Sequence, residues 1–293
     1  MPDEAQRDKA GRVMVSRLLM SAGPALATGL PILGIHGAPR SGTTWLGQIF
    51  NASPQTAFRY QPFFAHAFRA RVDAARTPEA LEAILDEIAV TEDEFILQRG
   101  SAALARETLE FPKREITRLV YKEVRYHNLL PLLLQIPRLR GVGIVRNPLD
   151  VLASWVRAPR EFRPEWRLAD EWRFAPSKNQ GRPAEFYGYA RWKAAALLFE
   201  RLQAADPARF RIVSYEALVG DPVGESAALF AFAGLPMCDQ VEAFLARSTS
   251  FEDGDPYGVL RGAGGLGDTG DLPDDIRQAV RDDLSGTPLE KHL

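Results

Sequence analysis

The sequence has little of three features that would place it in other classes of protein. Its one cysteine, Cys238, excludes an intramolecular disulfide and any metal site built from several cysteines. No run approaches the roughly 18 apolar residues of a membrane-spanning helix. The formal net charge of −2 argues against nucleic acid or an anionic membrane as the main partner. We therefore expect a cytoplasmic protein whose ligands are small molecules.

The N-terminal segment lacks the features of a secretory signal. It starts MPDEAQRDKAGR, with acidic residues where a signal is basic, and Arg17 interrupts the apolar run 13–20. We interpret the first 25 residues or so as a surface extension of a single domain that spans residues 1–293.

Lysine is also scarce, since six of the 36 basic residues are lysines and the others are arginines. Arginine suits planar, multidentate binding of phosphate and sulfate. The scarcity matters most in the stretch 32–50, where an apolar strand, a loop and a helix follow one another. Such a turn places backbone N–H groups and a helix N-terminus around an anion.

The loop in this stretch has the glycine spacing of a nucleotide-binding P-loop but not its lysine. Gly37 and Gly42 match GxxxxG, whereas Thr43 and Thr44 follow where a lysine and a hydroxyl residue would stand. The loop's cation is instead Arg40. This pattern suits one phosphate-like group better than a triphosphate with its magnesium. A P-loop kinase that uses ATP remains the alternative class of enzyme.

Apolar segments and helical periodicity predict the fold class. The predicted strands are 32–35, 118–124, 141–147 and 210–218. The predicted helices are 43–50, 79–89, 148–158, 184–205, 222–233 and one from 273. The polar, proline-punctuated segment 159–183 is interpreted as an insertion that forms a lid over an acceptor site.

Alternating helices and nearly continuous apolar strands predict an α/β three-layer sandwich around a mostly parallel sheet. Ligands of such sheets bind beyond the carboxyl ends of the strands. The glycine-containing loop, Lys122 and Arg146 all fall at such ends. One ligand site formed by these three elements is therefore expected.

The string PRSGTTWL, 39–46, resembles the 5′-phosphosulfate-binding loop of sulfotransferases that use 3′-phosphoadenosine 5′-phosphosulfate (PAPS). The resemblance implies the sulfotransferase fold and sulfuryl transfer, with PAPS as co-substrate and no metal. It implies that Arg40 lies beside the bridging and sulfuryl oxygens and that Trp45 stacks on adenine. It also implies that the 5′-phosphate is held by Ser41, Gly42, Thr43 and Thr44.

The string RNPLDVLAS resembles the 3′-phosphate-binding motif of the same family. Arg146 and Ser154, eight residues apart, would share one phosphate monoester through a guanidinium and a hydroxyl. Judged from the residues alone, an ion pair between Arg146 and Asp150 is an equally good interpretation.

Two weaker similarities concern the adenosine. SYEAL resembles the family's strand-end tyrosine motif, which implies that Tyr215 contacts adenosine, although a core aromatic at a strand end is the alternative. Arg261 and Gly262 resemble the remnant of a basic-glycine loop around the 3′-phosphate.

Catalysis of sulfuryl transfer needs positive charge near the leaving oxygen. Arg40 and Lys122 are the candidates, because the family places a lysine on the strand that corresponds to 118–124. An unpaired ammonium in an apolar strand is costly. Pairing of Lys122 with Glu123 is therefore the alternative.

The general base is not evident from the motifs. Val124 stands where many family members have histidine, and Gln61 stands where others have glutamate. The remaining candidates are Glu123, His127 and His66. We favour His66, because it lies in an aromatic segment and an imidazole has a suitable pKa.

Aromatic residues suggest a small apolar or aromatic acceptor that offers a hydroxyl or an amine. They are Phe58, Phe63, Phe64, Phe68, Trp166 and Trp172. A non-catalytic protein that binds adenosine 3′,5′-bisphosphate (PAP) is a further alternative, because neither usual base is present. The sequence leaves open whether the chain forms a homodimer.

Overall fold

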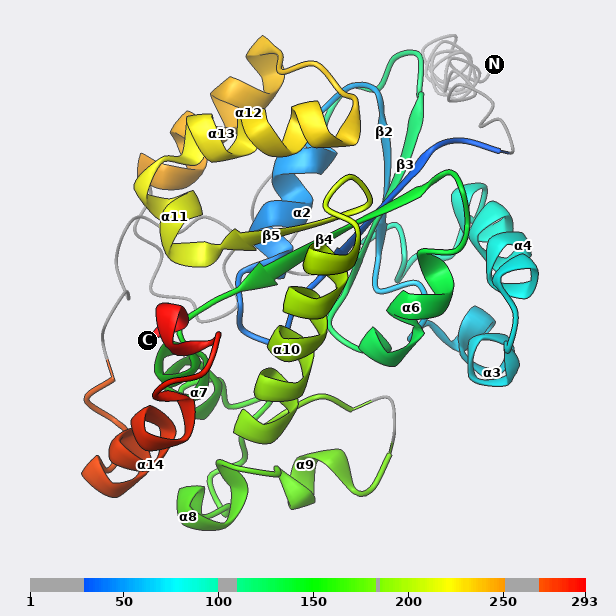
Figure 1. Ribbon diagram of the computed structural model, residues 1–293. Coiled ribbons are helices and arrows are strands. Elements are labelled where there is room, and N and C mark those ends of the chain that lie inside the picture. Colours follow the sequence, from blue (N-terminus) through cyan, green and yellow to red (C-terminus); the bar gives the residue numbers. More distant parts are fainter. Residues whose placement is uncertain (1–28, 100–109, 183–184, 251–268) are drawn as a thin grey trace, which may run out of the picture.

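A computed structural model describes residues 29–99, 110–182, 185–250 and 269–293 (Figure 1). Its centre is a five-stranded sheet in the order β2-β3-β1-β4-β5, and all four pairings between neighbours are parallel. The strands are β1 (Ile32–His36), β2 (Thr56–Tyr60), β3 (Arg118–Glu123), β4 (Leu139–Val145) and β5 (Phe210–Ser214).

Helices form a layer on each face of this sheet (Figure 1). One layer contains α2 (Thr43–Asn51), α11 (Tyr215–Gly220), α12 (Pro222–Ala233) and α13 (Asp239–Ser250). The other contains α3 (His66–Ala74), α4 (Pro78–Ala89), α6 (Leu130–Leu133), α7 (Pro148–Val156), α10 (Tyr189–Ala205) and α14 (Asp274–Leu284). Short helices are η1 (His127–Leu129), α8 (Leu168–Glu171), α9 (Pro176–Asn179) and η2 (Glu290–His292).

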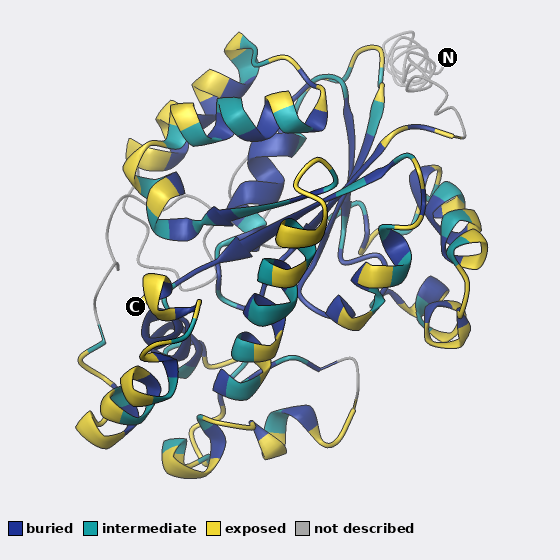
Figure 2. Ribbon diagram, in the orientation of Figure 1, coloured by how far each residue is buried: buried dark blue, intermediate teal, exposed yellow. Residues whose placement is uncertain are grey.

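Alternation along the central strand fixes which layer each side chain meets. In β1, Leu33 and Ile35 pack with the α2 layer, whereas Ile32 packs with the α4 layer. All five residues of β1 are buried, and the exposed residues lie on the outer faces of the helices (Figure 2). A strand buried on both faces explains the unbroken apolar sequence. The predicted three-layer α/β sandwich is confirmed.

The edge strand β2 was not predicted from the sequence. Arg59 interrupts its apolar residues, which obscured the strand pattern. The structure buries this arginine because its guanidinium reaches the end of α4, where Nε donates to the carbonyl of Ile88 at 2.9 Å and Nη2 donates to that of Ala89. Carbonyl groups at a helix C-terminus lack intrahelical partners and interact well with a cation.

Two predicted boundaries were wrong for a common reason, helix capping. The strand predicted at 210–218 is β5, and it ends at Ser214. The Ser214 hydroxyl caps α11 by accepting from the N–H of Ala217 at 3.2 Å. The strand predicted at 141–147 is β4, and it ends at Val145. Asn147 caps α7 by accepting from the N–H of Leu149 at 2.9 Å. A polar cap residue ends extended structure where hydropathy alone suggests continuation.

The remaining predictions concern two helices, membrane-spanning segments and two stretches near the ends of the chain. The helix predicted from 184 begins at Tyr189, and α13 was not predicted. Within the described ranges, no helix is long and apolar enough to cross a membrane. The N-terminal extension and the basic-glycine loop at Arg261 and Gly262 lie outside the described residues.

Candidate active site

The loop between β1 and α2 is shaped by two left-handed residues. Arg40 has φ 72° and Gly42 has φ 87°, so the chain turns sharply before Thr43 starts α2. A Cβ atom on Gly42 would lie 2.4 Å from Cδ2 of Tyr215. Glycine is therefore required both by the backbone and by the close approach of the tyrosine ring. The turn directs the N-terminus of α2 towards the loop.

This requirement predicts the effect of Gly42→Ala. The left-handed backbone and the overlap with Tyr215 should together lower the free energy of unfolding by about 1–3 kcal/mol. Urea denaturation measures it, with Gly220→Ala at the end of α11 as the control, because no atom lies within 4 Å of a Cβ placed there. Equal stability of the two variants would contradict this account of the loop.

The Ser41 hydroxyl indicates what the loop binds. Ser41 is fully buried, and its Oγ has no hydrogen-bond partner among the residues that the structure describes. Leaving a buried polar atom unsatisfied costs about 1–3 kcal/mol. A phosphate oxygen within the loop would satisfy it, and the neighbouring Thr43 hydroxyl and α2 N–H groups are further donors. These residues therefore fit the 5′-phosphate of PAPS.

The structure brings the two predicted anion motifs together. Nε of Arg40 donates to Oγ of Ser154 at 3.1 Å, although 114 residues separate them in the chain. Nη1 of Arg146 donates to the carbonyl oxygen of Arg40 at 3.3 Å. Hydrogen bonds thus join the loop after β1 to residues that follow β4, at the carboxyl edge of the sheet.

Arg146 forms the ion pair that was one of the two interpretations of the sequence, and its contact with a 3′-phosphate stays a prediction. Its Nη2 lies 3.7 Å from Oδ2 of Asp150, so the ion pair within α7 is present. Its Cζ also lies 4.5 Å from the centre of the Tyr215 ring, and its carbonyl accepts a hydrogen bond from Trp192 Nε1 at 3.0 Å. Asp150 and Tyr215 hold the guanidinium beside the loop, which is where a phosphate ligand is expected.

Trp45 and Tyr215 form an aromatic pair beneath the loop. Their ring centres are 6.2 Å apart in an edge-to-face arrangement, and both residues are buried. Trp45 Nε1 donates to Oγ of Ser248 in α13 at 3.0 Å. This bond fixes the orientation of the indole. Contact of either ring with adenosine stays a prediction.

Lys122 lies on the face of β3 that packs against α2. It is only 2% exposed, and its ammonium lies 4.5 Å from the centre of the Tyr60 ring. Burial lowers the pKa of Lys122, and the positive charges of Arg125 and Arg40 act in the same direction. The charge of Arg40 therefore acts on Lys122, and a catalytic role for the two cations stays a prediction.

The Glu123 side chain lies on the opposite face of β3. Its Oε1 accepts a hydrogen bond from the N–H of Phe63 at 2.7 Å, and the side chain is fully buried. Burial raises the pKa of Glu123. Strand alternation therefore separates the side chains of Lys122 and Glu123, and the described residues show no ion pair between them.

The two histidine candidates lie in very different surroundings. His127 is buried against Phe186 and His36, at ring-centre distances of 4.9 and 5.7 Å, and burial lowers the pKa of His127 to about 3. His66 is exposed at the start of α3. In the described part of the chain, no hydrogen bond, ion pair or ring contact joins His66 to another predicted site residue.

Three of the six aromatic residues that suggested an apolar or aromatic acceptor belong to the core. Phe58 packs against α2, while Phe63 and Phe68 pack in the α3 and α4 layer. Phe64, Trp166 and Trp172 are only partly buried. Phe58, Phe63 and Phe68 are therefore core residues, and an apolar or aromatic acceptor stays a prediction.

Two charged groups near the site were missed in the sequence. Arg125 donates to Oε1 of Gln61 at 2.6 Å and lies 4.0 Å from the centre of the Phe64 ring. Gln61 stands where some family members have glutamate, and its side-chain amide accepts a hydrogen bond from Arg125. Glu161 lies in the segment after α7. Burial lowers the pKa of Lys122, and the negative charge of Glu161 partly offsets that lowering. Both contacts join distant parts of the chain, so no local pattern could reveal them.

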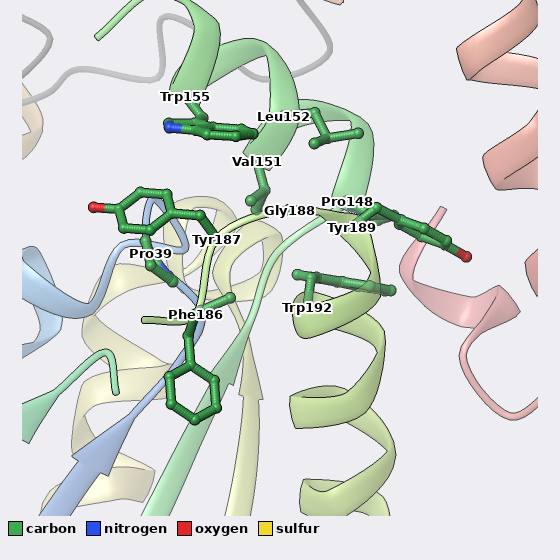
Figure 3. A pocket seen from close by; sticks show the side chains of 11 residues that line it. Pro39, Pro148, Val151, Leu152, Trp155, Phe186, Tyr187, Gly188, Tyr189 and Trp192 are labelled. Atoms are coloured by element: carbon green, nitrogen blue, oxygen red, sulfur yellow. The ribbon is translucent and has the colours of Figure 1, made fainter. Parts of the chain in front are cut away.

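An apolar pocket lies between the loop, α7 and α10 (Figure 3). Pro39 of the loop faces the ring of Tyr187 there, with Trp155 alongside (Figure 3). The other lining residues are Ala38, Pro148, Val151, Leu152, Phe186, Gly188, Tyr189 and Trp192. This pocket connects the loop to the segment that follows α7.

An α/β fold with an anion loop after its first strand and a second cation after a neighbouring strand is typical of proteins that bind phosphate groups. Residues 31–239 match the model of the sulfotransferase family, and the chain belongs to that family. It is a sulfotransferase, as the sequence motifs implied. No curated protein matches the sequence.

Solved structures share the fold at low sequence identity. Mouse sulfotransferase SULT7A1 complexed with PAP is 19% identical, with a TM-score of 0.53 over 89% of this chain and 86% of that one. Retinol dehydratase in a complex with retinol and PAP is 16% identical, with a TM-score of 0.52 over 88% of this chain and 82% of that one. The same enzyme with androsterone and PAP gives 15% and 0.51 over the same shares.

Proposed function

We propose that this sulfotransferase transfers the sulfuryl group to a hydroxyl or amine of a small apolar or aromatic molecule. The donor site is supported by the hydrogen bonds that join the two anion motifs, where Arg40 contacts Ser154 and Arg146. Bound PAPS supplies an activated sulfuryl group. The rest of the chemistry depends on how the chain's own residues bind and orient the two substrates.

Two sets of residues hold the donor in this proposal. Ser41, Gly42, Thr43 and Thr44 bind the 5′-phosphate through the loop and the start of α2. Arg146 and Ser154 bind the 3′-phosphate, with Arg261 and Gly262 as further candidates. Trp45 and Tyr215 lie between these sets and contact the adenosine. The edge-to-face packing of the two rings and the Arg146 contact with Tyr215 support this arrangement.

Arg40 and Lys122 act on the reacting atoms. The sulfuryl group leaves an oxygen on which negative charge develops, and two cations in a buried site stabilise that charge strongly. Because burial lowers the pKa of Lys122, the lysine can also give up a proton more readily than an exposed one. No step in this scheme needs a metal ligand from the chain.

The acceptor class has narrower support than the donor. Phe64 and Tyr60 lie beside Arg125 and Lys122 respectively. Retinol and androsterone, the molecules bound by retinol dehydratase, are both apolar. An aromatic or apolar molecule with one polar reacting group fits such a mixture of rings and cations.

Transfer to simple acceptors tests the proposal. The protein is incubated with PAPS and either 2-naphthol, benzylamine or glucose, and sulfated product and PAP are quantified by mass spectrometry. We expect product with 2-naphthol or benzylamine and little with glucose. Phosphorylated product from ATP and magnesium would favour the kinase alternative. PAP binding without any transfer would favour the non-catalytic alternative.

A further inference from the structure

Glu161 is fixed in position by the backbone of the segment that follows α7. Its carbonyl accepts a hydrogen bond from Trp155 Nε1 at 3.1 Å, and its N–H donates to the carbonyl of Ala158 at 2.8 Å. The next residue, Phe162, packs against the Trp155 ring at 5.1 Å between centres. The carboxylate therefore projects from a rigid turn rather than from a loose surface loop.

One oxygen of this carboxylate carries all of its observed hydrogen bonds. Oε2 accepts from the hydroxyl of Tyr187 at 2.5 Å and from Nζ of Lys178 at 2.8 Å. In the described ranges, no hydrogen bond reaches Oε1. The side chain is 28% exposed, so Oε1 is accessible to a ligand. An oriented carboxylate with one accessible oxygen is the arrangement that proton transfer needs.

Glu161 is linked to the transfer site through Tyr187. Its partner Tyr187 faces Pro39, the residue before Arg40, across the pocket of Figure 3. Its charge raises the pKa of Lys122 and that of Tyr60, and Arg125 lowers the pKa of Glu161 itself. The charge of Glu161 therefore interacts with the charges of Lys122 and Arg125.

The protonation state of Glu161 suits a base. Burial raises its pKa, but the hydrogen bonds from Lys178 and Tyr187 and the charges of Lys178 and Arg125 outweigh burial. The pKa of Glu161 therefore lies below its ordinary value, and the group is ionised at neutral pH. By contrast, Glu123 is fully buried with a raised pKa, and His66 is exposed on α3.

We propose that Glu161 is the general base of sulfuryl transfer, an inference that rests on the proposed function. The proton of the acceptor hydroxyl or amine moves to Oε1 of Glu161. The freed electron pair of the acceptor forms the new bond to sulfur, and the bond from sulfur to the bridging oxygen breaks. The electrons of the broken bond stay on the 5′-phosphate of PAP beside Arg40 and Lys122. Tyr187 and Lys178 are positioning residues for the carboxylate.

Replacement of the carboxylate by its amide is the first test. Glu161→Gln keeps the size of the side chain and removes its basicity, so kcat with 2-naphthol should fall roughly 10²- to 10⁴-fold. Affinity for PAP, measured by calorimetry, should not change. The matched control is Glu165→Gln in the same segment, where the side chain is 65% exposed and lies 3.7 Å from Arg163. The control should alter neither quantity.

The pH profile separates a base from a merely structural residue. Tyr187→Phe removes a hydrogen bond that lowers the pKa of Glu161, so this pKa should rise. The acid limb of kcat/KM, where Glu161 becomes protonated as pH falls, should then move to higher pH. A residue that only supports the fold would change the height of the profile and leave its limbs in place.

The outcomes distinguish this proposal from the proposed function. If the wild type transfers sulfuryl groups and Glu161→Gln keeps its kcat, Glu161 is not the base and the proposed function stands. The same conclusion follows if His66→Ala abolishes transfer while Glu161→Gln does not. If the wild type binds PAP but transfers nothing to any acceptor, both proposals fail.

Discussion

Replacing Arg146 by alanine should weaken PAP binding by at least about tenfold, or roughly 1.4 kcal/mol. The guanidinium is 4% exposed and is held by Asp150, by the Tyr215 ring and by the Arg40 carbonyl. A charge-assisted bond between this group and the 3′-phosphate would account for the loss. Calorimetric titration with PAP measures it.

The control for this variant lies at the other end of the same strand. Arg138 precedes β4 and pairs with Glu82 and Asp86 at 2.6 and 2.7 Å. Arg138→Ala should lower stability and leave PAP affinity unchanged. Arg146→Lys should fall between wild type and alanine, because an ammonium keeps the charge but not the fork. Unchanged affinity in Arg146→Ala would remove Arg146 from the 3′-phosphate site.

Replacing Lys122 by methionine should lower kcat roughly 10²- to 10³-fold with little effect on PAP affinity. The side chain is almost completely buried, and its ammonium contacts the Tyr60 ring. If the positive charge acts on the transition state, its loss appears in kcat rather than in binding. An equal loss of affinity would instead place Lys122 among the donor-binding residues.

The same variant should gain stability, and the gain should depend on pH. The pKa of Lys122 is lowered in the folded protein, so the unfolded chain binds more protons between that pKa and the ordinary value. As pH falls from about 10 towards neutral, wild-type stability therefore decreases. The advantage of Lys122→Met over wild type should grow over that window. Urea denaturation at several pH values measures this difference.

A second, partly buried lysine provides a matched control. Burial lowers the pKa of Lys113 to about 7, but its ammonium donates to the carbonyls of Asn51 and Ser53. Lys113→Met would leave these carbonyls unsatisfied, so it should lower stability without changing kcat. A variant of Lys122 that behaved like this control would contradict the catalytic role.

The loop and its strand were predictable because their signal is local. Gly42 adopts a left-handed backbone, and Arg40 is the cation of the loop. Both residues belong to the short string PRSGTTWL. The contact of Arg40 with Ser154 could be anticipated only because each residue belongs to its own recognisable motif. Sequence patterns of this kind report the backbone geometry that an anion requires.

The acceptor side was not predictable because its contacts join separated segments. Gln61 accepts from Arg125, 64 residues away, and Glu161 accepts from Tyr187, 26 residues away. Neither pair has a characteristic spacing. His66 was favoured for its side-chain chemistry, but α3 leaves that residue exposed. Which side chain meets the acceptor depends on the packing of the segment after α7, and hydropathy carries no information about that packing.

Calorimetric titration of the protein with PAP, and separately with ATP and magnesium, tests the central claim most directly. A loop with Thr43 at the position of the P-loop lysine, and with Arg40 as its cation, should bind PAP tightly and ATP with magnesium weakly or not at all. Preference for ATP with magnesium would contradict the assignment of this site to a sulfuryl donor.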